Sequence, residues 1–233
     1  MSGTWVAPGK ARERSLVYGA MGSWKSSGAL EIARKVKGKL WIVDTDCAFE
    51  GLLEREYADV RDKVAVKEVA DWPEFVDGLE WAFGKAEADD WVVVDSCSDA
   101  QDFGLDFATS MIRGQDVADY LMGWAERHNQ SEFKATGVQG SLIEMGVYDL
   151  YNPAWRKSLV RRVKAPGCHL YLTAQAGVAG VNPREDAQTK VLYGGIGWKP
   201  RTQRDLGFSA ATVLYVEKDK MGRGYYSQVK SWG

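Results

Sequence analysis

A lysine followed by a serine, Lys25-Ser26, closes a glycine-containing stretch that begins at Gly19. The stretch matches the phosphate-loop pattern G-x-x-x-x-G-K-[ST] except at Trp24, where the pattern has its second glycine. In such a loop, backbone N–H groups and a helix N-terminus hold polyphosphate, the lysine neutralises the β- and γ-phosphates, and the hydroxyl binds Mg²⁺. The alternative is a chance turn between a strand and a helix. The predicted phosphate-binding residues are Gly19, Ala20, Met21, Gly22, Ser23, Trp24, Lys25, Ser26 and Ser27.

The tryptophan at position 24 has two interpretations. If the loop requires a positive φ there, a bulky residue is penalised. If residue 24 has an ordinary helical conformation, an aromatic ring is allowed and can pack over a bound nucleotide. We expect the second.

Acidic side chains follow two predicted strands. Asp95 closes the run Trp91-Val-Val-Val-Asp, and Asp44 and Asp46 end the run that starts at Leu40. Ligands gather at the carboxyl ends of parallel strands, so we expect Asp95 to hold Mg²⁺ with Ser26. Asp46 is the candidate base for an attacking water. The alternative for all three is a solvated turn residue, because Asp favours strand ends.

These residues need a parallel sheet to bring them together. Short apolar runs alternate with segments of helical spacing, which favours a mostly parallel sheet flanked by helices and closed by a C-terminal antiparallel edge hairpin. Pro153 is expected to open a helix that runs through Val163. The predicted strands are 15–18, 40–43, 64–69, 91–94, 170–173, 213–216 and an edge hairpin over 224–229, and the predicted helices are 26–36, 72–86 and 99–128.

Composition limits the class of protein. At 233 residues we expect a single domain over 1–233, with a short extension over 1–14. A formal net charge of −2 means that any nucleic-acid contact must come from local basic segments. No apolar run suits a signal peptide or a membrane span, and three scattered cysteines with two histidines suit neither disulfides nor zinc. We therefore expect a cytoplasmic protein, in a bacterium or in a phage-infected host, with no membrane partner.

The order of these motifs resembles the RecA family. The phosphate loop, Asp44-Thr-Asp46, Val94-Asp95-Ser and Thr173-Ala-Gln175 follow one another as they do in that family. More narrowly, the chain resembles the compact phage RecA-like ATPases (AAA-family) that assist single-strand annealing and recombination. The resemblance covers about residues 15–230 and implies ATP and Mg²⁺ as cofactors and a RecA-like core.

The resemblance also implies roles for two residues. Asp46 stands where the family has its catalytic glutamate, one methylene shorter, which favours slow hydrolysis or a repositioned water. Gln175 matches the γ-phosphate sensor that couples the nucleotide to the following loop; a buried glutamine that satisfies backbone groups is the alternative. The catalytic set is then Lys25, Asp46, Asp95 and Gln175.

By the same resemblance, residues 176–204 correspond to a DNA-binding loop. The segment is rich in glycine and charge and lacks periodicity, so we expect a functional or mobile loop. Cations with Tyr193 and Trp198 between them suit sequence-tolerant binding of single-stranded DNA, although a solvated charged loop has the same composition. The candidate cations are Arg184, Lys190, Lys199, Arg201 and Arg204.

The family also supplies cations from a neighbouring subunit to the γ-phosphate, which implies a homo-oligomer, either a ring or a filament. The candidates for that role are Lys218, Lys220, Arg223 and Lys230. The functional hypothesis is an ATP-dependent DNA recombination or annealing protein acting on single-stranded DNA, with a single-strand-binding protein as a further candidate partner. The alternatives are another DNA motor (a packaging, helicase or loading ATPase) and a nucleotide-binding module that does not hydrolyse ATP.

Overall fold

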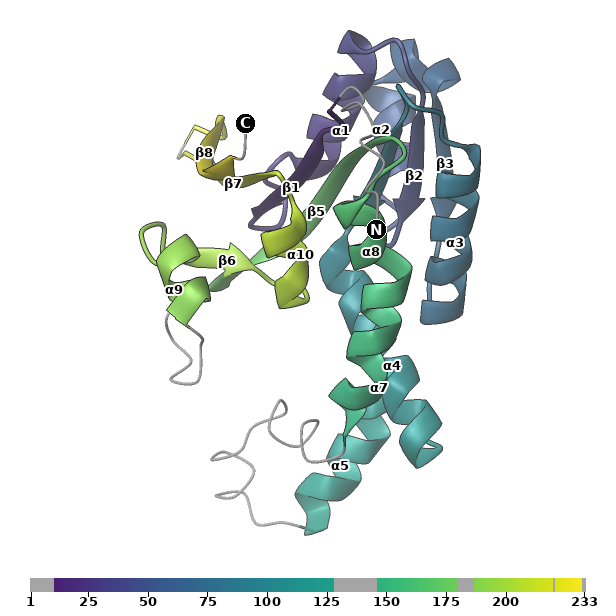
Figure 1. Cartoon of the computed structure of the whole chain (residues 1–233), viewed down its shortest axis with the longest axis vertical. Coiled ribbons are helices and arrows are strands. Elements are labelled where there is room, and N and C mark those ends of the chain that lie inside the picture. Colours follow the sequence, from purple (N-terminus) through teal and green to yellow (C-terminus); the bar gives the residue numbers. More distant parts are fainter. Residues whose placement is uncertain (1–10, 128–145, 180–186, 220, 232–233) are drawn as a thin grey trace, which may run out of the picture.

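The structure is a computed structural model that describes residues 11–127, 146–179, 187–219 and 221–231. In these residues, helices cover both faces of one central sheet, and α4, α5 and α7 project beyond the end of the sheet (Figure 1). This is an α/β fold. Residues 1–10 of the predicted N-terminal extension lie outside the described part.

The sheet is mostly parallel, as predicted. Its described strands follow the order β3-β2-β4-β5-β1-β7-β8, and each neighbouring pair from β3 to β7 is parallel. The last strand, β8, is antiparallel to β7, which confirms the predicted C-terminal edge pair, and β6 is antiparallel to β5. The bounds are β1 Arg14–Gly19, β2 Leu40–Asp44, β3 Val64–Glu68, β4 Trp91–Asp95, β5 His169–Val178, β6 Trp198–Pro200, β7 Thr212–Lys218 and β8 Gly224–Ser231.

Helices and short helical turns connect these strands. A 3₁₀ turn, η1 Ala58–Lys63, precedes β3, and a π-helical turn, η2 Arg156–Val160, joins α7 to α8. The α-helices are α1 Lys25–Lys35, α2 Phe49–Arg55, α3 Trp72–Lys85, α4 Cys97–Arg113, α5 Val117–Arg127, α7 Val147–Trp155, α8 Arg161–Lys164, α9 Ala187–Tyr193 and α10 Arg204–Ser209.

Strand periodicity divides the core into two layers. Successive side chains of a strand point to opposite faces, so in β4 the Val93 side chain packs with α1, α2 and η1, whereas Val92 and Val94 pack with α3, α4, α7 and η2. Every one of these valines is fully buried. Burial on both faces explains the unbroken apolar run in the sequence.

The helix expected to begin at Pro153 begins earlier. Its first residue is Val147, preceded by Gly146 at φ 70°, and Pro153 lies inside α7. Proline lacks an N–H and normally ends a helix. Here Trp155, fully buried against Trp72 and Phe75, holds the helix in place, and the π turn follows directly.

The segment 176–204 was expected to be a loop, and this is wrong for most of its described part. The strand β5 continues to Val178, residues 187–193 form α9, and β6 pairs with residues 176–178 of β5. These elements are short and are separated by Gly194, Gly195 and Gly197. The pairing of β6 with β5 is made by backbone groups, so the sequence shows no apolar periodicity there. Residues 180–186, and with them Arg184, lie outside the described part.

Two helical glycines give a test of this packing. A methyl group on Gly104 of α4 would lie 2.7 Å from Tyr151 Cε2 and 2.9 Å from Trp72 Cε3, whereas one on Gly84 of α3 meets nothing within 4 Å. We expect Gly104→Ala to lower the free energy of unfolding by about 1–3 kcal/mol through overpacking. Gly84→Ala should leave it unchanged or raise it by up to about 1 kcal/mol. Urea denaturation measures both, and equal effects would contradict this packing of α4 on α7.

Candidate functional site

A cavity of about 390 Å³ lies at the carboxyl ends of the parallel strands and brings most of the predicted site residues together. The loop after β1, the ends of β2, β4 and β5, and the end of β7 all reach it. Its lining is Met21, Gly22, Ser23, Trp24, Lys25, Ser26, Ser27, Asp46, Leu52, Asp95, Ser96, Asp99, Gln175 and Lys218. All four predicted catalytic residues are therefore in one cavity.

The loop leaves the sheet at the end of β1, which lies between β5 and β7. Gly19 is paired with Gln175 on one side and Val216 on the other. A methyl group on Gly19 would lie 2.2 Å from the Val216 carbonyl oxygen and 2.6 Å from Ser23 Oγ, so only glycine fits. The Ser23 N–H then donates to the Ala20 carbonyl at 3.3 Å, and Gly22 has φ 70°.

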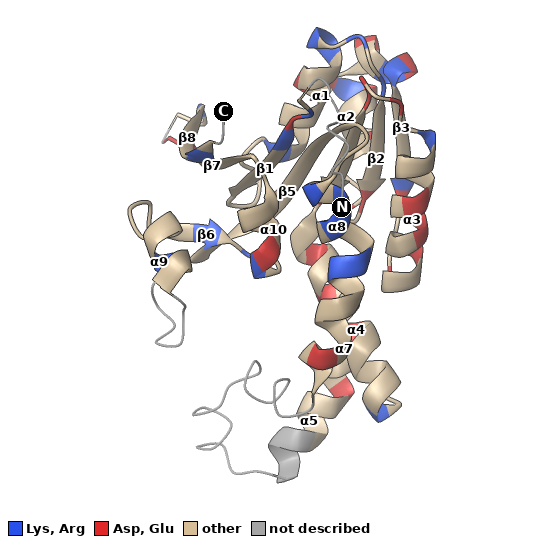
Figure 2. Ribbon diagram, in the orientation of Figure 1, with Lys and Arg blue, Asp and Glu red and all other residues tan. Residues whose placement is uncertain are grey.

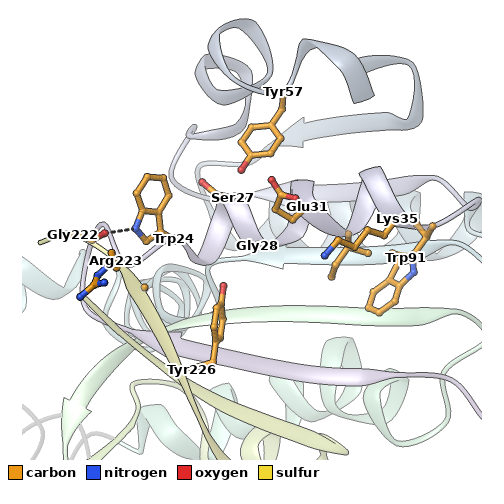
Figure 3. Close-up of a pocket in the computed structure, with 13 residues that line it drawn as sticks. Trp24, Ser27, Gly28, Glu31, Lys35, Tyr57, Trp91, Gly222, Arg223 and Tyr226 are labelled. Carbon is orange, nitrogen blue, oxygen red and sulfur yellow. Dashed lines mark hydrogen bonds between the residues drawn. The ribbon is translucent and has the colours of Figure 1, made fainter. Parts of the chain in front are cut away.

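Trp24 departs from the expected conformation. Its φ of 67° and ψ of 18° are left-handed, so the expectation of an ordinary helical conformation is wrong. Residue 24 is the N-cap of α1, and the loop keeps the positive φ there although no glycine supplies it. Two contacts from the C-terminal edge of the sheet hold the ring. The Nε1–H donates to the Gly222 carbonyl at 3.3 Å (Figure 3), and the Nζ of Lys218, the last residue of β7, lies 4.7 Å from the ring centroid.

Lys25 begins α1 and points back over the loop. Its Nζ donates to the Ala20 carbonyl at 2.9 Å, the Gly19 carbonyl at 3.3 Å and Ser23 Oγ at 3.4 Å. Burial lowers the pKa of this ammonium, and the nearby Asp95 carboxylate offsets part of that shift. A cation held by neutral oxygens of its own loop can exchange these contacts for phosphate oxygens.

Asp95, at the end of β4, is buried beside Lys25 and Ser26. Its Oδ1 accepts a hydrogen bond from Thr173, and its buried Oδ2 has no hydrogen-bond partner among the described residues. Burial raises the pKa of this carboxyl to about 6, and the Ser26 and Thr173 hydroxyls offset part of the shift.

An unsatisfied carboxylate oxygen beside a hydroxyl suits a divalent cation. In the described part of the chain no group of three or more His, Cys, Asp or Glu side chains could hold a metal ion by itself. This pairing fits Mg²⁺, which is usually bound by one or two protein oxygens together with phosphate oxygens and water. Asp95 and Ser26 would be its protein ligands.

Asp44 and Asp46 have different environments. Asp44 is fully buried and accepts the Phe49 N–H at 3.1 Å and the Asp46 N–H at 3.3 Å, so it shapes the turn before α2. Asp46 is exposed and lines the cavity. Loss of solvent around the carboxyl in the cavity, together with hydrogen bonding to Asp44, raises the pKa of Asp46 to about 6. Of the two carboxylates, Asp46 is therefore the one placed to accept a proton from water.

Sequence reasoning missed Ser96 and Asp99, which also line the cavity. Ser96 is the N-cap of α4, its hydroxyl donates to Asp99, and the Asp99 N–H donates back to it at 3.3 Å. Ser96-Cys-Ser-Asp99 has the spacing of a capping box, with Asp in place of Glu or Gln, and this signal could have found both residues.

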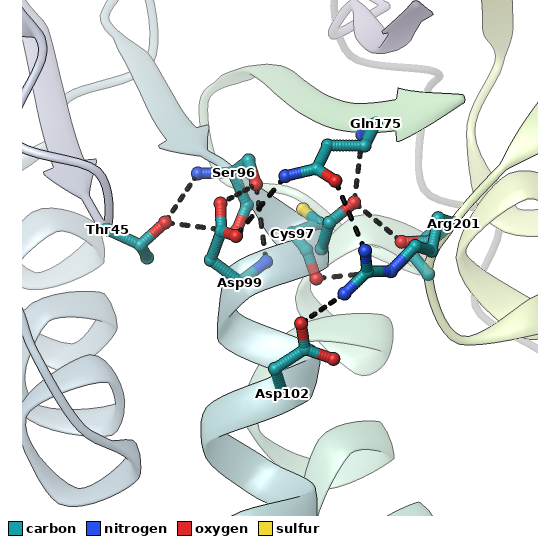
Figure 4. Close-up of polar contacts among 9 residues, drawn as sticks. Thr45, Ser96, Cys97, Asp99, Asp102, Gln175 and Arg201 are labelled. Atoms are coloured by element: carbon teal, nitrogen blue, oxygen red, sulfur yellow. Dashed lines mark hydrogen bonds and ion pairs between the residues drawn. The ribbon is translucent and has the colours of Figure 1, made fainter. Parts of the chain in front are cut away.

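A polar network connects this helix start with the segment after β5 (Figure 4). Gln175 Nε2 donates to Asp99 Oδ1 at 3.4 Å, and Arg201 Nη1 donates to Gln175 Oε1 at 3.3 Å. The backbone N–H of Arg201 donates to the Gln175 carbonyl at 2.8 Å, and its guanidinium also contacts Asp102. Arg201, predicted to bind DNA, is thus joined to the cavity through Gln175.

A second cavity of about 670 Å³ continues along α1 from the first (Figure 3). The two share Trp24 and Ser27 in their linings. Tyr57 and Tyr226 approach the outer face of α1 from opposite sides, with Glu31 between them in Figure 3.

The remaining DNA candidates lie on the segment after Gln175. Lys190 is on α9, Lys199 is on β6, and Arg204 begins α10 beside Asp205. In Figure 2 part of β6 is blue, the colour of Lys and Arg. Tyr193 is not available to stack on a base: it is buried against Tyr18. Trp198 is partly exposed and stacks on Tyr215.

The four candidates for a cation from a neighbouring subunit differ in placement. Lys218 lines the cavity of its own chain. Arg223 pairs with Asp219 at 2.8 Å, and Lys220 lies outside the described residues. Lys230 has a structural role, because its Nζ donates to the carbonyls of Phe208 at 2.7 Å and Ala210 at 2.8 Å at the end of α10.

No protein-family model matches this chain, and no curated protein sequence matches it significantly. Among the described residues, no helix combines the length and apolar character needed to cross a membrane.

The buried carboxyl of Asp95 gives a stability prediction. Its pKa is about 6 in the fold against 3.8 for an aspartate in an unfolded chain, so ionisation costs stability above about pH 4 and the full cost is present above about pH 6. We expect Asp95→Asn, which keeps an acceptor for Thr173, to raise the free energy of unfolding by up to about 3 kcal/mol at pH 8 and by about half as much at pH 5.

Urea denaturation at the two pH values measures this difference. The exposed Asp77 on α3 provides the control, and Asp77→Asn should change stability by less than about 0.5 kcal/mol at either pH. An Asp95→Asn protein less stable than wild type at pH 8 would contradict the burial cost.

Proposed function

We propose that this protein is a RecA-like P-loop ATPase that binds Mg-ATP in the cavity at the strand ends and acts on single-stranded DNA as a homo-oligomer. One observation carries the proposal. Lys25 and Ser26 at the start of α1 line the same cavity as the carboxylates of Asp95 and Asp46. A cation for phosphate, a hydroxyl and carboxylate for Mg²⁺, and a base for water are the parts that phosphoryl transfer to water requires.

Each residue has a defined task in this proposal. Lys25 leaves the carbonyls of its loop and neutralises the β- and γ-phosphates. Ser26 and Asp95 hold Mg²⁺, which neutralises charge on the phosphates. Asp46 orients the attacking water and accepts its proton, and its raised pKa keeps it a more effective base than an ordinary aspartate at neutral pH.

The second cavity favours a nucleoside triphosphate over a bare polyphosphate. It begins beside Ser27, one residue beyond the proposed Mg²⁺ ligand, and offers aromatic and carboxylate side chains. A base and ribose need such a mostly apolar space with a few polar groups.

The proposal is tested by ATP turnover with and without single-stranded DNA. We expect strand-stimulated turnover in wild type and a loss of about 100-fold or more in Lys25→Ala, because a transition-state cation is removed. Lys85→Ala, on the exposed end of α3, is the matched control and should retain turnover. Wild-type turnover equal to that of Lys25→Ala would contradict an ATPase at this loop.

Binding to DNA is supported by the link between the cavity and the segment that carries Lys190 and Lys199. Arg201 contacts Gln175 through both its backbone and its side chain, so nucleotide contacts at Gln175 can reach β6 directly. Cations there would contact phosphates, and the exposed face of Trp198 would contact bases.

Charge reversal tests this surface. We expect Lys190→Glu with Lys199→Glu to weaken ATP-dependent retention of single-stranded DNA and to make it less salt-sensitive, because two phosphate contacts are lost. Lys37→Glu with Lys85→Glu makes the same charge change elsewhere. Retention reduced equally by both pairs would show that net charge, and not this segment, controls binding. A duplex preference in the same assay would favour a packaging, helicase or loading motor.

A nucleotide-binding module that does not hydrolyse ATP is the second candidate. Two observations favour it: the positive φ at Trp24 in place of glycine and the hydrogen bond between Asp46 and Asp44. Tight Mg-ATP binding without turnover would identify this function.

A further inference from the structure

Lys218 is placed beside the phosphate loop of its own chain. It is the last residue of β7, which runs parallel to β1 with Val216 opposite Gly19, so position 218 extends beyond the strand end alongside the loop. Its Nζ lies 3.8 Å from the point where a Cβ on Gly22 would be, and its side chain lines the same cavity as Lys25 and Asp95. The loop therefore has two ammonium groups from one chain.

Trp24 holds this second ammonium in place. The Lys218 Nζ lies over the indole at 4.7 Å from its centroid, within the range of a cation–π interaction. The indole is also held at its nitrogen, because its Nε1–H donates to the Gly222 carbonyl at 3.3 Å (Figure 3). A glycine at position 24 would make none of these side-chain contacts.

The residues that follow β7 are themselves tightly held. Asp219 accepts the N–H of Arg223 at 2.8 Å and of Met221 at 2.9 Å, and its other oxygen accepts Arg223 Nε at 2.8 Å and the Tyr225 hydroxyl at 3.2 Å. Arg223 therefore forms an ion pair with the Asp219 carboxylate. Among the described residues of this connection, Lys218 is thus the cation that lines the cavity at the strand ends.

We propose that Lys218 binds the terminal phosphate of a nucleotide on its own chain, and that Trp24 is the positioning residue that aims it. This inference rests on the proposed function. Lys25 and Lys218 would together neutralise the terminal phosphates before any neighbouring subunit arrives. The tryptophan then contributes something that glycine cannot. It lacks the conformational freedom of glycine, but its aromatic face makes a contact that orients Lys218.

Equilibrium binding tests the inference without requiring turnover. Mg-ATP and Mg-ADP affinities are measured by calorimetry at protein concentrations where the chain is monomeric. We expect Lys218→Ala to reduce the preference for ATP over ADP by about tenfold or more, the loss of one charge-assisted contact. Lys85→Ala should retain the wild-type preference. An unchanged preference in Lys218→Ala overturns the inference while leaving ATP binding intact. Failure of wild type to bind either nucleotide overturns the proposed function, and the inference with it.

The role of Trp24 is tested by the preference for ATP over ADP, which a change in stability alone would not alter. Trp24→Gly removes the ring and relieves the positive φ, so the free energy of unfolding should not fall, whereas the preference for ATP should fall toward that of Lys218→Ala. Trp24→Phe keeps an aromatic face and should retain most of the preference. A Trp24→Gly protein with the wild-type preference would overturn the positioning role.

Mixing two impaired variants distinguishes a cation from the same chain from one supplied by a neighbour. Lys25→Ala retains Lys218 but lacks the loop lysine, and Lys218→Ala has the reverse defect. If Lys218 acts within its own chain, mixed oligomers should show no more turnover than either variant alone. Recovery of turnover on mixing overturns the inference, because a neighbouring Lys218 would then have reached the intact loop.

Discussion

The parallel pairing of β1 with β5 and β7 is the constraint on which the site depends. It places Gln175 and Val216 on either side of Gly19, so the loop must leave the sheet between two neighbouring strand ends. The Val216 carbonyl leaves no room for a side chain at position 19 and turns the chain into the loop. From there β5 supplies Gln175, β7 supplies Lys218, and β4, one strand further, supplies Asp95.

The cost of this arrangement falls on its charges. Asp95 is buried with one oxygen lacking a partner in the described structure, and Lys25 is partly buried against the neutral carbonyls of its loop. Burial shifts the pKa of each toward its neutral form, which means that both are held in an environment unfavourable to charge. Such unfavourable burial of charge is typical of a site that binds a strongly charged ligand. The fold loses stability there, and the charges of a bound ligand would offset the loss.

The sequence predicted the parts that depend on local pattern. Apolar runs located the strands, since burial on both faces makes each run continuous, and the Asp residues at their ends could be placed in one cavity because parallel strands end together. What it missed depends on tertiary contacts. The β6 pairing uses backbone groups that leave no periodic trace, Pro153 stays helical because Trp155 is buried nearby, and Lys218 faces its own loop only through the register of β7 on β1. The conformation of Trp24 was wrongly predicted for the same reason, since its partners Lys218 and Gly222 lie at the end of β7 and just after it, almost two hundred positions away in the sequence.

The left-handed residue at the start of α1 has a consequence for how phosphate loops are recognised. Glycine at that position of the pattern marks a positive φ angle, because glycine is the residue that adopts such an angle without steric strain. Here a bulky residue keeps the same angle because the C-terminal edge pair holds its ring. On the function proposed above, a motif defined by residue types would miss this loop, whereas one defined by backbone torsion angles would include it. The pairing of an aromatic residue in the loop with a lysine at the end of a neighbouring parallel strand is then the feature by which similar loops could be sought.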